Sequence, residues 1–345
     1  MYQRTKELKG VSGIKSFKNE AYYTIEGVLM VNDNSIIDDV EGNSFWFIDG
    51  GIYFFNEEGE RRFKKGDVNH LLKFPLFTEA ELNGEILCKS NFRRENRKWK
   101  WELGVFNLES LNVVRELPFE NYTVELVVDY LGIGHSAKNE LSAIDTKEDQ
   151  IKWELKLDQF GEGELKEILG VYQAQLLVAC SDHLLLSVDV NTGEILHKWQ
   201  ELPGFEEGQY KGLLPEPADF VLDKEAGKLI GVFSKYYFEI DLESGEISYE
   251  DIRQELNTHH INSFRRIGNN PFTKDHLFVT AHAELVERPN VDLDCVLALN
   301  RNTKKVDWVH IFKDTGLGTN VPQITSNHLY QLDTERNLYV FERIS

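Results

Sequence analysis

The chain has 345 residues, of which 41% are hydrophobic, 12% aromatic and 28% charged, and these values exclude a disordered chain and allow a large core. Its 38 basic and 58 acidic residues give a net charge of −20, which repels phosphate backbones and anionic lipid. Nucleic acid and membrane surfaces are therefore not expected as partners, and a basic protein is favoured.

The N-terminal segment, residues 1–10, has basic residues but no apolar run behind them, so it lacks the pattern of a secretory signal. No stretch approaches the roughly 18 apolar residues of a membrane-spanning helix. The three cysteines, Cys88, Cys180 and Cys295, are far apart and lie in apolar runs, which is typical of free buried thiols in a reducing compartment. We therefore expect a cytoplasmic protein.

One hairpin pattern repeats along the chain. It consists of an apolar strand, an Asp or Asn, a short turn rich in Thr, Ser, Gly and Glu, and a second strand that often carries Trp. In chain order the Asp or Asn residues of the copies are Asn56, Asn107, Asp145, Asp189, Asp241 and Asn300. Such side chains accept hydrogen bonds from their own turn, so we predict that they are turn anchors and do no chemistry.

The spacing of these anchors indicates the fold. They lie 38 to 59 residues apart, which brackets the roughly 40–50 residues of a four-stranded propeller blade. Two further strand patterns precede each hairpin, and helical patterns are limited to short segments near 67–73 and 251–256. Six hairpins extend to about residue 312, and residues 323–341 add three strands.

The missing strand of the last unit is predicted to come from residues 1–16, because a strand from the other terminus closes a propeller and removes its exposed sheet edges. The fold prediction is all-β: a single closed β-propeller domain over residues 1–345, with seven four-stranded blades. Six or eight blades are the alternatives.

At these hairpins the sequence resembles the quinoprotein-like, or PQQ-like, propeller repeat, which has the pattern Ala-x-Asp-x-x-Thr-Gly-x-x-x-Trp. The resemblance is clearest at 186–199, 238–247, 141–153 and 297–308, although the turn Gly is absent after Asp145 and Asn300. It implies an architecture that hosts dehydrogenases and binding scaffolds alike. The quinone-dependent dehydrogenases of this superfamily are longer and commonly carry adjacent cysteines, which this chain lacks, so no cofactor is expected.

Long connections indicate which face of a propeller is elaborated. Here they are the predicted inter-blade links 65–80, 200–217, 250–274 and 313–320, and two loops between second and third strands, 91–98 and 284–292. Both types open on one face of a propeller, the top. The binding residues predicted on this face are Phe92, Arg93, Arg94, Phe205, Tyr210, His259, His260 and Arg265.

Aromatic and Arg side chains dominate the energy of protein interfaces, so this set predicts a protein-binding surface. In the alternative, the charges are solvated and the aromatic rings pack beneath the loops. The adjacent pair His259 and His260 lacks the further ligands that a metal site needs, so no metal is expected. No known nucleophile or zinc motif occurs.

These observations predict a non-catalytic protein-binding propeller, monomeric on its own. A bacterial immunity or regulatory protein that masks a basic partner is the specific form considered. The alternative function is an enzyme that acts on a small molecule or glycan in a central top pocket. Its acid, base or clamp residues would come from Asp67, Glu206, Glu207, His259, His260 and Arg265.

Overall fold

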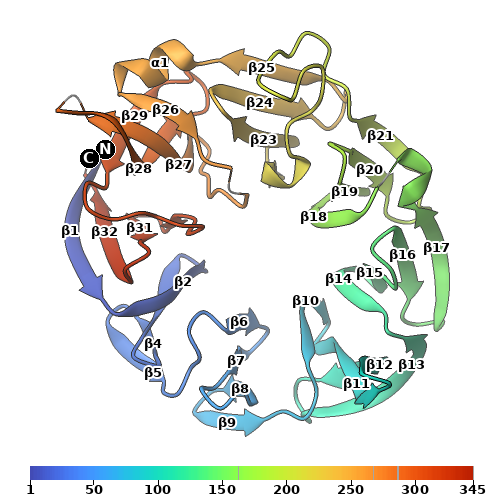
Figure 1. Ribbon diagram of the computed structural model, residues 1–345. Helices are drawn as coiled ribbons and strands as arrows, with labels where there is room; N and C mark the ends of the chain where they lie inside the picture. The colour runs from blue at the N-terminus through green and yellow to red at the C-terminus, as the bar shows by residue number, and fades with distance from the viewer. Residues whose placement is uncertain (162, 267, 286, 345) are drawn as a thin grey trace. The chain divides into compact units, whose positions relative to one another are not determined.

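The computed structural model describes residues 1–161, 163–266, 268–285 and 287–344. These residues form two compact units. Unit 1 comprises residues 1–43, 204–211 and 218–345, and unit 2 comprises residues 44–203 and 212–217. Within the described residues the strands form eight four-stranded sheets, in which all pairs of neighbouring strands are antiparallel (Figure 1).

Unit 1 contains four of the sheets. The first sheet contains β2 (Val11–Phe17), β3 (Glu20–Ile25), β4 (Val28–Val31) and β5 (Asn34–Ile37). The second contains β22 (Val221–Asp223), β23 (Lys228–Phe233), β24 (Tyr236–Asp241) and β25 (Ile247–Asp251). The third contains β26 (Ile261–Phe264), β27 (His276–Leu285), β28 (Arg288–Asn300) and β29 (Val306–Ile311). Helix α1 (Arg253–Thr258) precedes β26, and a 3-10 turn, η2 (Pro217–Asp219), precedes β22.

The last sheet of unit 1 joins the two ends of the chain. It contains β30 (Gln323–Ile324), β31 (His328–Leu332) and β32 (Asn337–Arg343), and β1 (Tyr2–Lys9) pairs antiparallel with β32 from Tyr2 opposite Arg343 to Lys9 opposite Asn337. The prediction that the N-terminal segment supplies the missing strand is confirmed.

Unit 2 contains the other four sheets. The first contains β6 (Phe45–Ile48), β7 (Gly51–Phe55), β8 (Arg61–Lys65) and β9 (Val68–Leu71), and the second contains β10 (Leu76–Leu82), β11 (Glu85–Glu95), β12 (Lys98–Asn107) and β13 (Asn112–Glu120). The third contains β14 (Thr123–Val128), β15 (Leu131–His135), β16 (Glu140–Asp145) and β17 (Gln150–Lys156), which a 3-10 turn, η1 (Leu157–Phe160), follows. The fourth contains β18 (Leu165–Tyr172), β19 (Gln175–Cys180), β20 (Leu185–Asp189) and β21 (Ile195–Trp199).

The predicted blade count of seven is wrong, because the part of the chain that the structure describes forms eight sheets. The sheet that was missed is β2 to β5, residues 11–37, whose strands are joined by short turns without the Asp-to-Trp hairpin pattern. The segment near 67–73, considered as a short helix, forms β9, whereas the short helix near 251–256 is confirmed as α1. No helix among the described residues is long and apolar enough to cross a membrane.

Four of the predicted turn anchors hold their turns by side-chain hydrogen bonds, as predicted. The carboxylate Oδ1 of Asp189 accepts backbone N–H bonds from Asn191 at 2.8 Å and Thr192 at 2.9 Å. Asp145, Asp241 and Asn300 make the same pair of bonds to the residues two and three positions later. These side chains therefore fix the turns between the third and fourth strands of their sheets.

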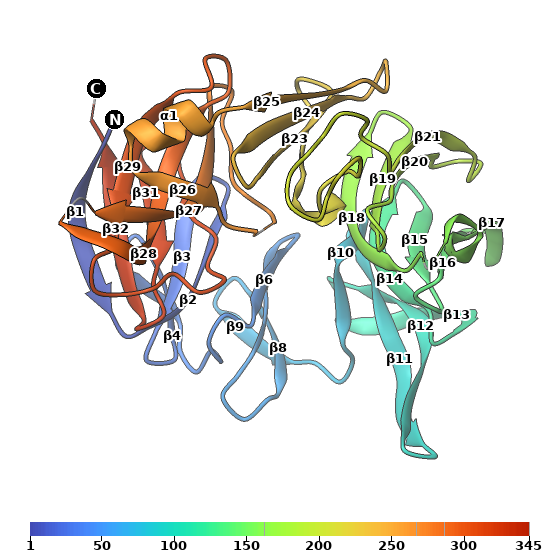
Figure 2. The same cartoon turned by 45° about the horizontal axis from the view of Figure 1, so that its top comes forward.

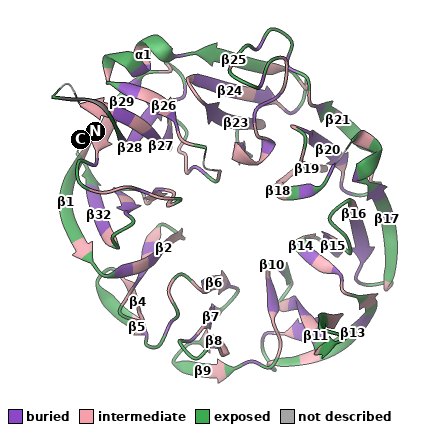
Figure 3. Cartoon of the chain, in the orientation of Figure 1, coloured by how far each residue is buried: buried purple, intermediate pink, exposed green. Residues whose placement is uncertain are grey.

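The core lies between adjacent sheets of each unit, and the outer strands β1, β17, β21 and β25 are largely exposed (Figure 3). In unit 2, for example, Leu176, Leu186 and Val188 of one sheet pack with Ile133 and Leu141 of the next. The three cysteines are free and buried, as predicted. Burial raises the pKa of the Cys180 thiol to about 12, so this thiol stays protonated and unreactive at neutral pH.

Candidate protein-binding surface

The strands β11 and β12 form a long two-stranded ribbon, which Figure 2 shows extending beyond the other strands of its sheet. The segment 91–98, predicted to be a loop, is instead the far half of this ribbon. Pairing continues to Glu95 opposite Lys98, and the turn residues Asn96 and Arg97 have φ angles of 50° and 66°. Positive φ at both central residues is typical of the tight hairpin turn that matches the twist of the strands.

One face of the ribbon is aromatic. The rings of Phe92 and Trp99 are stacked, with centroids 4.7 Å apart and planes 7° apart, and Trp101 lies 6.4 Å from Phe92. The Trp101 ring is held in place by a hydrogen bond, in which its Nε1 donates to the carbonyl oxygen of Tyr122 at 3.1 Å. Trp99 is 55% exposed, so the ribbon holds a large ring in a fixed orientation in contact with solvent.

The other face of the ribbon carries a network of paired charges. Arg93 lies 2.8 Å from Glu95 and 3.5 Å from Glu102, and Lys100 lies 3.1 Å from Glu120. The hydrogen bond from Arg93 lowers the pKa of the Glu95 carboxyl group. All these groups are exposed, so their pairs add little stability, but they leave this face nearly neutral.

Three cations at the end of the ribbon have no acidic partner among the described residues: Arg94, Arg97 and Lys98. Arg94 is directly opposite Trp99 in the strand register, and its guanidinium carbon lies 5.8 Å from the centre of the Trp99 ring. The tip therefore combines an exposed aromatic ring with cations that are free to bind another molecule.

The structure places Phe205 and Tyr210 in the core of unit 1, where they present almost no surface. Phe205 is completely buried against Phe233 and Tyr236, and Tyr210 is 5% exposed with its ring 4.7 Å from that of Phe233. The alternative, in which loop aromatics pack beneath the loops, holds for these two residues. Burying an aromatic ring of the 200–217 loop lowers the free energy more than leaving it in solvent. The sequence pattern alone does not show which of these two environments the ring has.

The other binding residues predicted in unit 1 are partly exposed, and they interact with different neighbouring groups. His259 ends helix α1, with its Nε2 3.3 Å from Glu255, and His260 is exposed with a φ of 57°. Arg265 is mostly buried, and it donates to Asp294 at 3.1 Å and to the carbonyl oxygen of Gly318. Arg265 thus ties the end of β26 to β28 and to the segment between β29 and β30.

Several predicted loops contain regular structure. The range 65–80 includes β9 and part of β10, and 250–274 includes α1 and β26, apart from residue 267, which lies outside the described residues. In 284–292, residues 284–285 and 288–292 belong to β27 and β28, and residue 286 lies outside the described residues. The ribbon belongs to unit 2 and the His259 to Arg265 segment to unit 1, so a shared top face stays a prediction.

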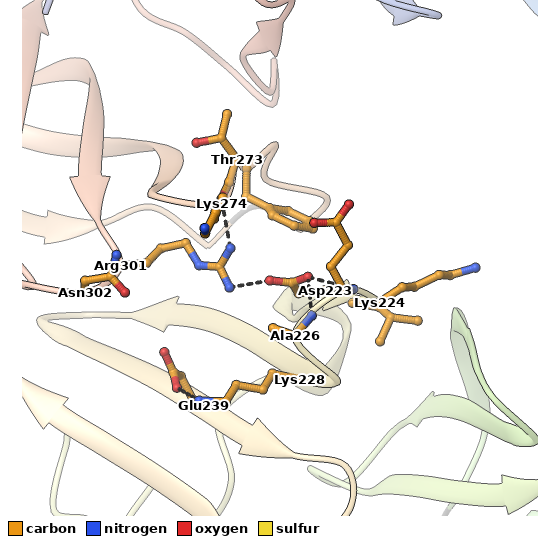
Figure 4. Close-up of a pocket in the computed structure, with 12 residues that line it drawn as sticks. Asp223, Lys224, Ala226, Lys228, Glu239, Thr273, Lys274, Arg301 and Asn302 are labelled. Carbon is orange, nitrogen blue, oxygen red and sulfur yellow. Dashed lines mark hydrogen bonds and ion pairs between the residues drawn. The ribbon is translucent and has the colours of Figure 1, made fainter.

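Unit 1 also contains a pocket of about 760 Å³ where the turn after β22 meets the turn after β28 (Figure 4). Its floor holds an ion pair in which Arg301 Nη2 donates to Asp223 Oδ2 at 2.5 Å. Arg301 Nη1 also donates to the carbonyl oxygen of Thr273 at 2.8 Å. Beside them Lys228 Nζ lies 2.6 Å from Glu239.

The pocket does not support acid–base catalysis. Burial raises the pKa of Asp223, but the hydrogen bond and charge of Arg301 and the backbone N–H bonds from Ala226 and Glu225 together lower the net pKa. Burial likewise raises the pKa of Glu239, and Lys228, Lys304 and the hydrogen bond from Tyr237 together lower the net pKa. Both groups stay ionised and paired, so neither can donate a proton near neutral pH. The lining contains neither His nor Cys.

The remaining candidates of the enzyme hypothesis are divided between the two units. Asp67 is exposed in the turn before β9 in unit 2. In unit 1, Glu206 lies 3.6 Å from Lys211, and Glu207 accepts a hydrogen bond from Ser234 at 2.6 Å. The part of the chain that the structure describes holds no group of three His, Cys, Asp or Glu residues placed to bind a metal ion.

No protein-family model and no curated protein sequence matches the chain. Solved structures with a similar fold include the computationally designed Ika8 protein, with a TM-score of 0.59, 11% identity, and coverage of 97% of this chain and 96% of that one. BamB from Moraxella catarrhalis has a TM-score of 0.54 at 10% identity, with 99% and 100% covered. Sqt1 from Saccharomyces cerevisiae has 0.57 at 12% identity, with 100% and 98% covered.

At these identities the likenesses show the fold alone. They extend over nearly the whole chain, and the chain's own strands form eight antiparallel sheets of four. Membership of the PQQ-like superfamily stays a prediction. The chain has the all-β architecture of a β-propeller.

Proposed function

We propose that this propeller is a non-catalytic protein-binding scaffold and that the β11–β12 ribbon is its main contact. The observation that carries the proposal is the exposed Trp99, held against Phe92 and beside Arg94 at the end of the ribbon. Trp and Arg are the residues most enriched at the energetic centres of protein interfaces.

The geometry favours binding in two ways. Trp99 is already stacked on Phe92, so little side-chain entropy is lost when a partner covers it. An aromatic side chain buries about 150–250 Å², and covering the exposed half of such a ring is worth roughly 2–3 kcal/mol at about 25 cal/mol per Å². This surface is therefore sufficient for one strong anchor. Phe92 and Arg94 lie beside it on the same face of the ribbon, and Arg93 lies on the opposite face.

Finer parts of the function are also proposals. The net charge of −20 supports a basic partner for the body of the propeller, and an immunity or regulatory protein that masks such a partner is one form of this role. We further propose that the protein is cytoplasmic, monomeric on its own, and related to the PQQ-like propellers through its hairpin repeats. His259, His260 and Arg265 of unit 1 are proposed as further binding residues.

The test is affinity enrichment from the native host with four immobilised forms of the chain: wild type, Trp99→Ala, Ile151→Ala and Ile195→Ala. Ile151 and Ile195 are matched controls because they are exposed by 51% and 37% on outer strands of the same unit. We expect a specific protein that is retained by the wild type and both controls and lost with Trp99→Ala.

Thermal unfolding of all four forms shows whether each is folded. Equal retention by folded Trp99→Ala would refute the ribbon as the contact. If no protein is retained above a blank matrix by any folded form, the scaffold function itself is refuted.

A further inference from the structure

We infer that the tip of the β11–β12 ribbon binds an acidic segment of its protein partner, opposite in charge to the basic partner that the whole chain favours. The inference rests on the proposed function and specifies the chemistry of the contact. It follows from where the positive charge of this acidic chain is concentrated.

The tip is strongly basic. Residues 93–100 contain five basic residues and one acidic residue, a local net charge of +4, within a chain whose net charge is −20. Arg93 and Lys100 are neutralised by Glu95, Glu102 and Glu120. The charges left without an acidic partner among the described residues are Arg94, Arg97 and Lys98, and all three side chains are exposed.

The free cations lie close to the anchor ring in the ribbon. Arg94 is opposite Trp99 in the strand register, Arg97 is in the turn, and Lys98 is opposite Glu95 on the other face. A segment that inserts an apolar side chain against Trp99 therefore places its neighbouring side chains near the guanidinium groups of Arg94 and of the turn residue Arg97. Carboxylates form charge-assisted hydrogen bonds with these groups, whereas a basic segment would meet only repulsion.

The salt concentration determines whether an approaching segment is affected mainly by the charge of the tip or by the net charge of the whole chain. At 0.15 M the Debye length is about 8 Å, so an acidic segment at the tip experiences mainly the cations there that have no acidic partner among the described residues. At 0.01 M it is about 30 Å, and the negative charge of the whole chain then opposes the approach. Affinity for an acidic segment should therefore be greatest at intermediate salt, because about 1 M salt screens the tip as well.

Single-stranded nucleic acid is a different ligand that also uses aromatic stacking and Arg. The base of the ribbon disfavours it, because Glu102, Glu116 and Glu120 follow the three cations along the same sheet. Asn91 holds two of these carboxylates in place by donating to Glu102 at 2.7 Å and to Glu116 at 2.8 Å. A phosphate backbone longer than the tip would meet these groups.

The experiment measures fluorescence anisotropy of three labelled probes with the full chain at 0.01, 0.15 and 1 M salt. The probes are a 16-residue Glu peptide with Leu and Phe at every third or fourth position, its Lys counterpart, and a 16-nucleotide single-stranded oligo-dT. The variants are Trp99→Ala, the double variant Arg94→Glu with Arg97→Glu, and a matched control, Lys138→Glu with Lys166→Glu. The control makes the same charge change at two exposed positions of the same unit.

We expect the Glu peptide to bind best at 0.15 M, with affinity at least about tenfold weaker for Trp99→Ala, at least about fivefold weaker for the tip double variant, and unchanged for the control. Preferential binding of the Lys peptide, stronger binding of the oligonucleotide, or failure of the Glu peptide to bind would overturn the inference. If the double variant is silent while Trp99→Ala weakens binding, the acidic preference is also overturned, but the ribbon remains the contact. Failure of the proposed function is seen separately, as equal retention of the host protein by folded Trp99→Ala.

Discussion

Replacing Arg301 by Met tests the ion pair that joins the second and third sheets of unit 1. Both side chains of the Asp223–Arg301 pair are 8% exposed, and their N to O distance is 2.5 Å. Arg301→Met keeps most of the side-chain volume but leaves the Asp223 carboxylate buried without its cation. Removing one partner of a buried pair costs about 3–5 kcal/mol, so we expect the free energy of unfolding to fall by that amount at pH 7.

The change in the pKa of Asp223 determines how the stability of the wild type and of Arg301→Met depends on pH. In the wild type the folded-state pKa of Asp223 is lowered, so its stabilisation is present above its unfolded pKa of about 3.9 and is lost as the pH falls through the folded value. In Arg301→Met, burial acts without the guanidinium and raises the pKa. The carboxyl group can then be protonated at mild acidity, so the defect of the variant should shrink between pH 7 and pH 5.

Urea unfolding at pH 7 and pH 5 measures these free energies. The control is the double variant Arg301→Met with Asp223→Asn, which removes both charges but keeps the Oδ1 that accepts N–H bonds from Glu225 at 3.1 Å and Ala226 at 3.0 Å. We expect the double variant to be more stable than Arg301→Met at pH 7. A loss below about 1 kcal/mol in Arg301→Met, or a double variant no more stable than the single one, would refute the argument.

Three further predictions concern stability. Deleting residues 1–9 removes β1 and leaves the edge of β32 unpaired, so the melting temperature should fall with a loss of several kcal/mol, and an unchanged value would contradict the role of β1. Asp189→Ala should cost about 1 kcal/mol in denaturant unfolding without weakening partner binding, and loss of binding in an equally stable variant would contradict the anchor role. Burial lowers the pKa of His310 to about 4, so stability should be complete above about pH 6.5 and decline toward pH 4, by up to about 3 kcal/mol. His310→Phe should remove that decline, and an identical decline in both proteins would contradict the assignment.

The sequence predicted those parts of the fold that local chemistry determines. An Asp or Asn followed by small polar residues satisfies the turn backbone by itself, and Asp145, Asp189, Asp241 and Asn300 all do so. The terminal strand was predictable because three strands at one end leave an unpaired edge, and β1 fills it.

The predicted number of blades was wrong because one four-stranded sheet is formed with a different type of turn. In β2 to β5 the turns are made by short pairs such as Asn32 and Asp33, both with positive φ, so no long hairpin signature appears. The Asn56 hairpin joins the second and third strands of its sheet, whereas the Asp189 hairpin joins the third and fourth, so counting anchors does not count sheets.

The sequence prediction of a binding surface named Phe92, Arg93 and Arg94 of the ribbon but not Trp99 and Trp101, and the binding role of these residues stays a prediction. A signal was present: after Asn96, Trp99 and Trp101 alternate with Lys98 and Lys100, which is the pattern of a strand with one aromatic face. Phe205 and Tyr210 could not be assigned, because whether a loop aromatic packs inward depends on Phe233 and Tyr236, which are distant in sequence.

The most direct test of the account is site-specific crosslinking from the ribbon in the native host. A photo-reactive phenylalanine analogue is placed at Trp99, and separately at the control position Ile151, which is exposed to a similar extent on β17. The account predicts a discrete crosslinked protein from position 99, absent from position 151 and suppressed by the Arg94→Glu with Arg97→Glu change. Crosslinks of equal yield and pattern from both positions would contradict it.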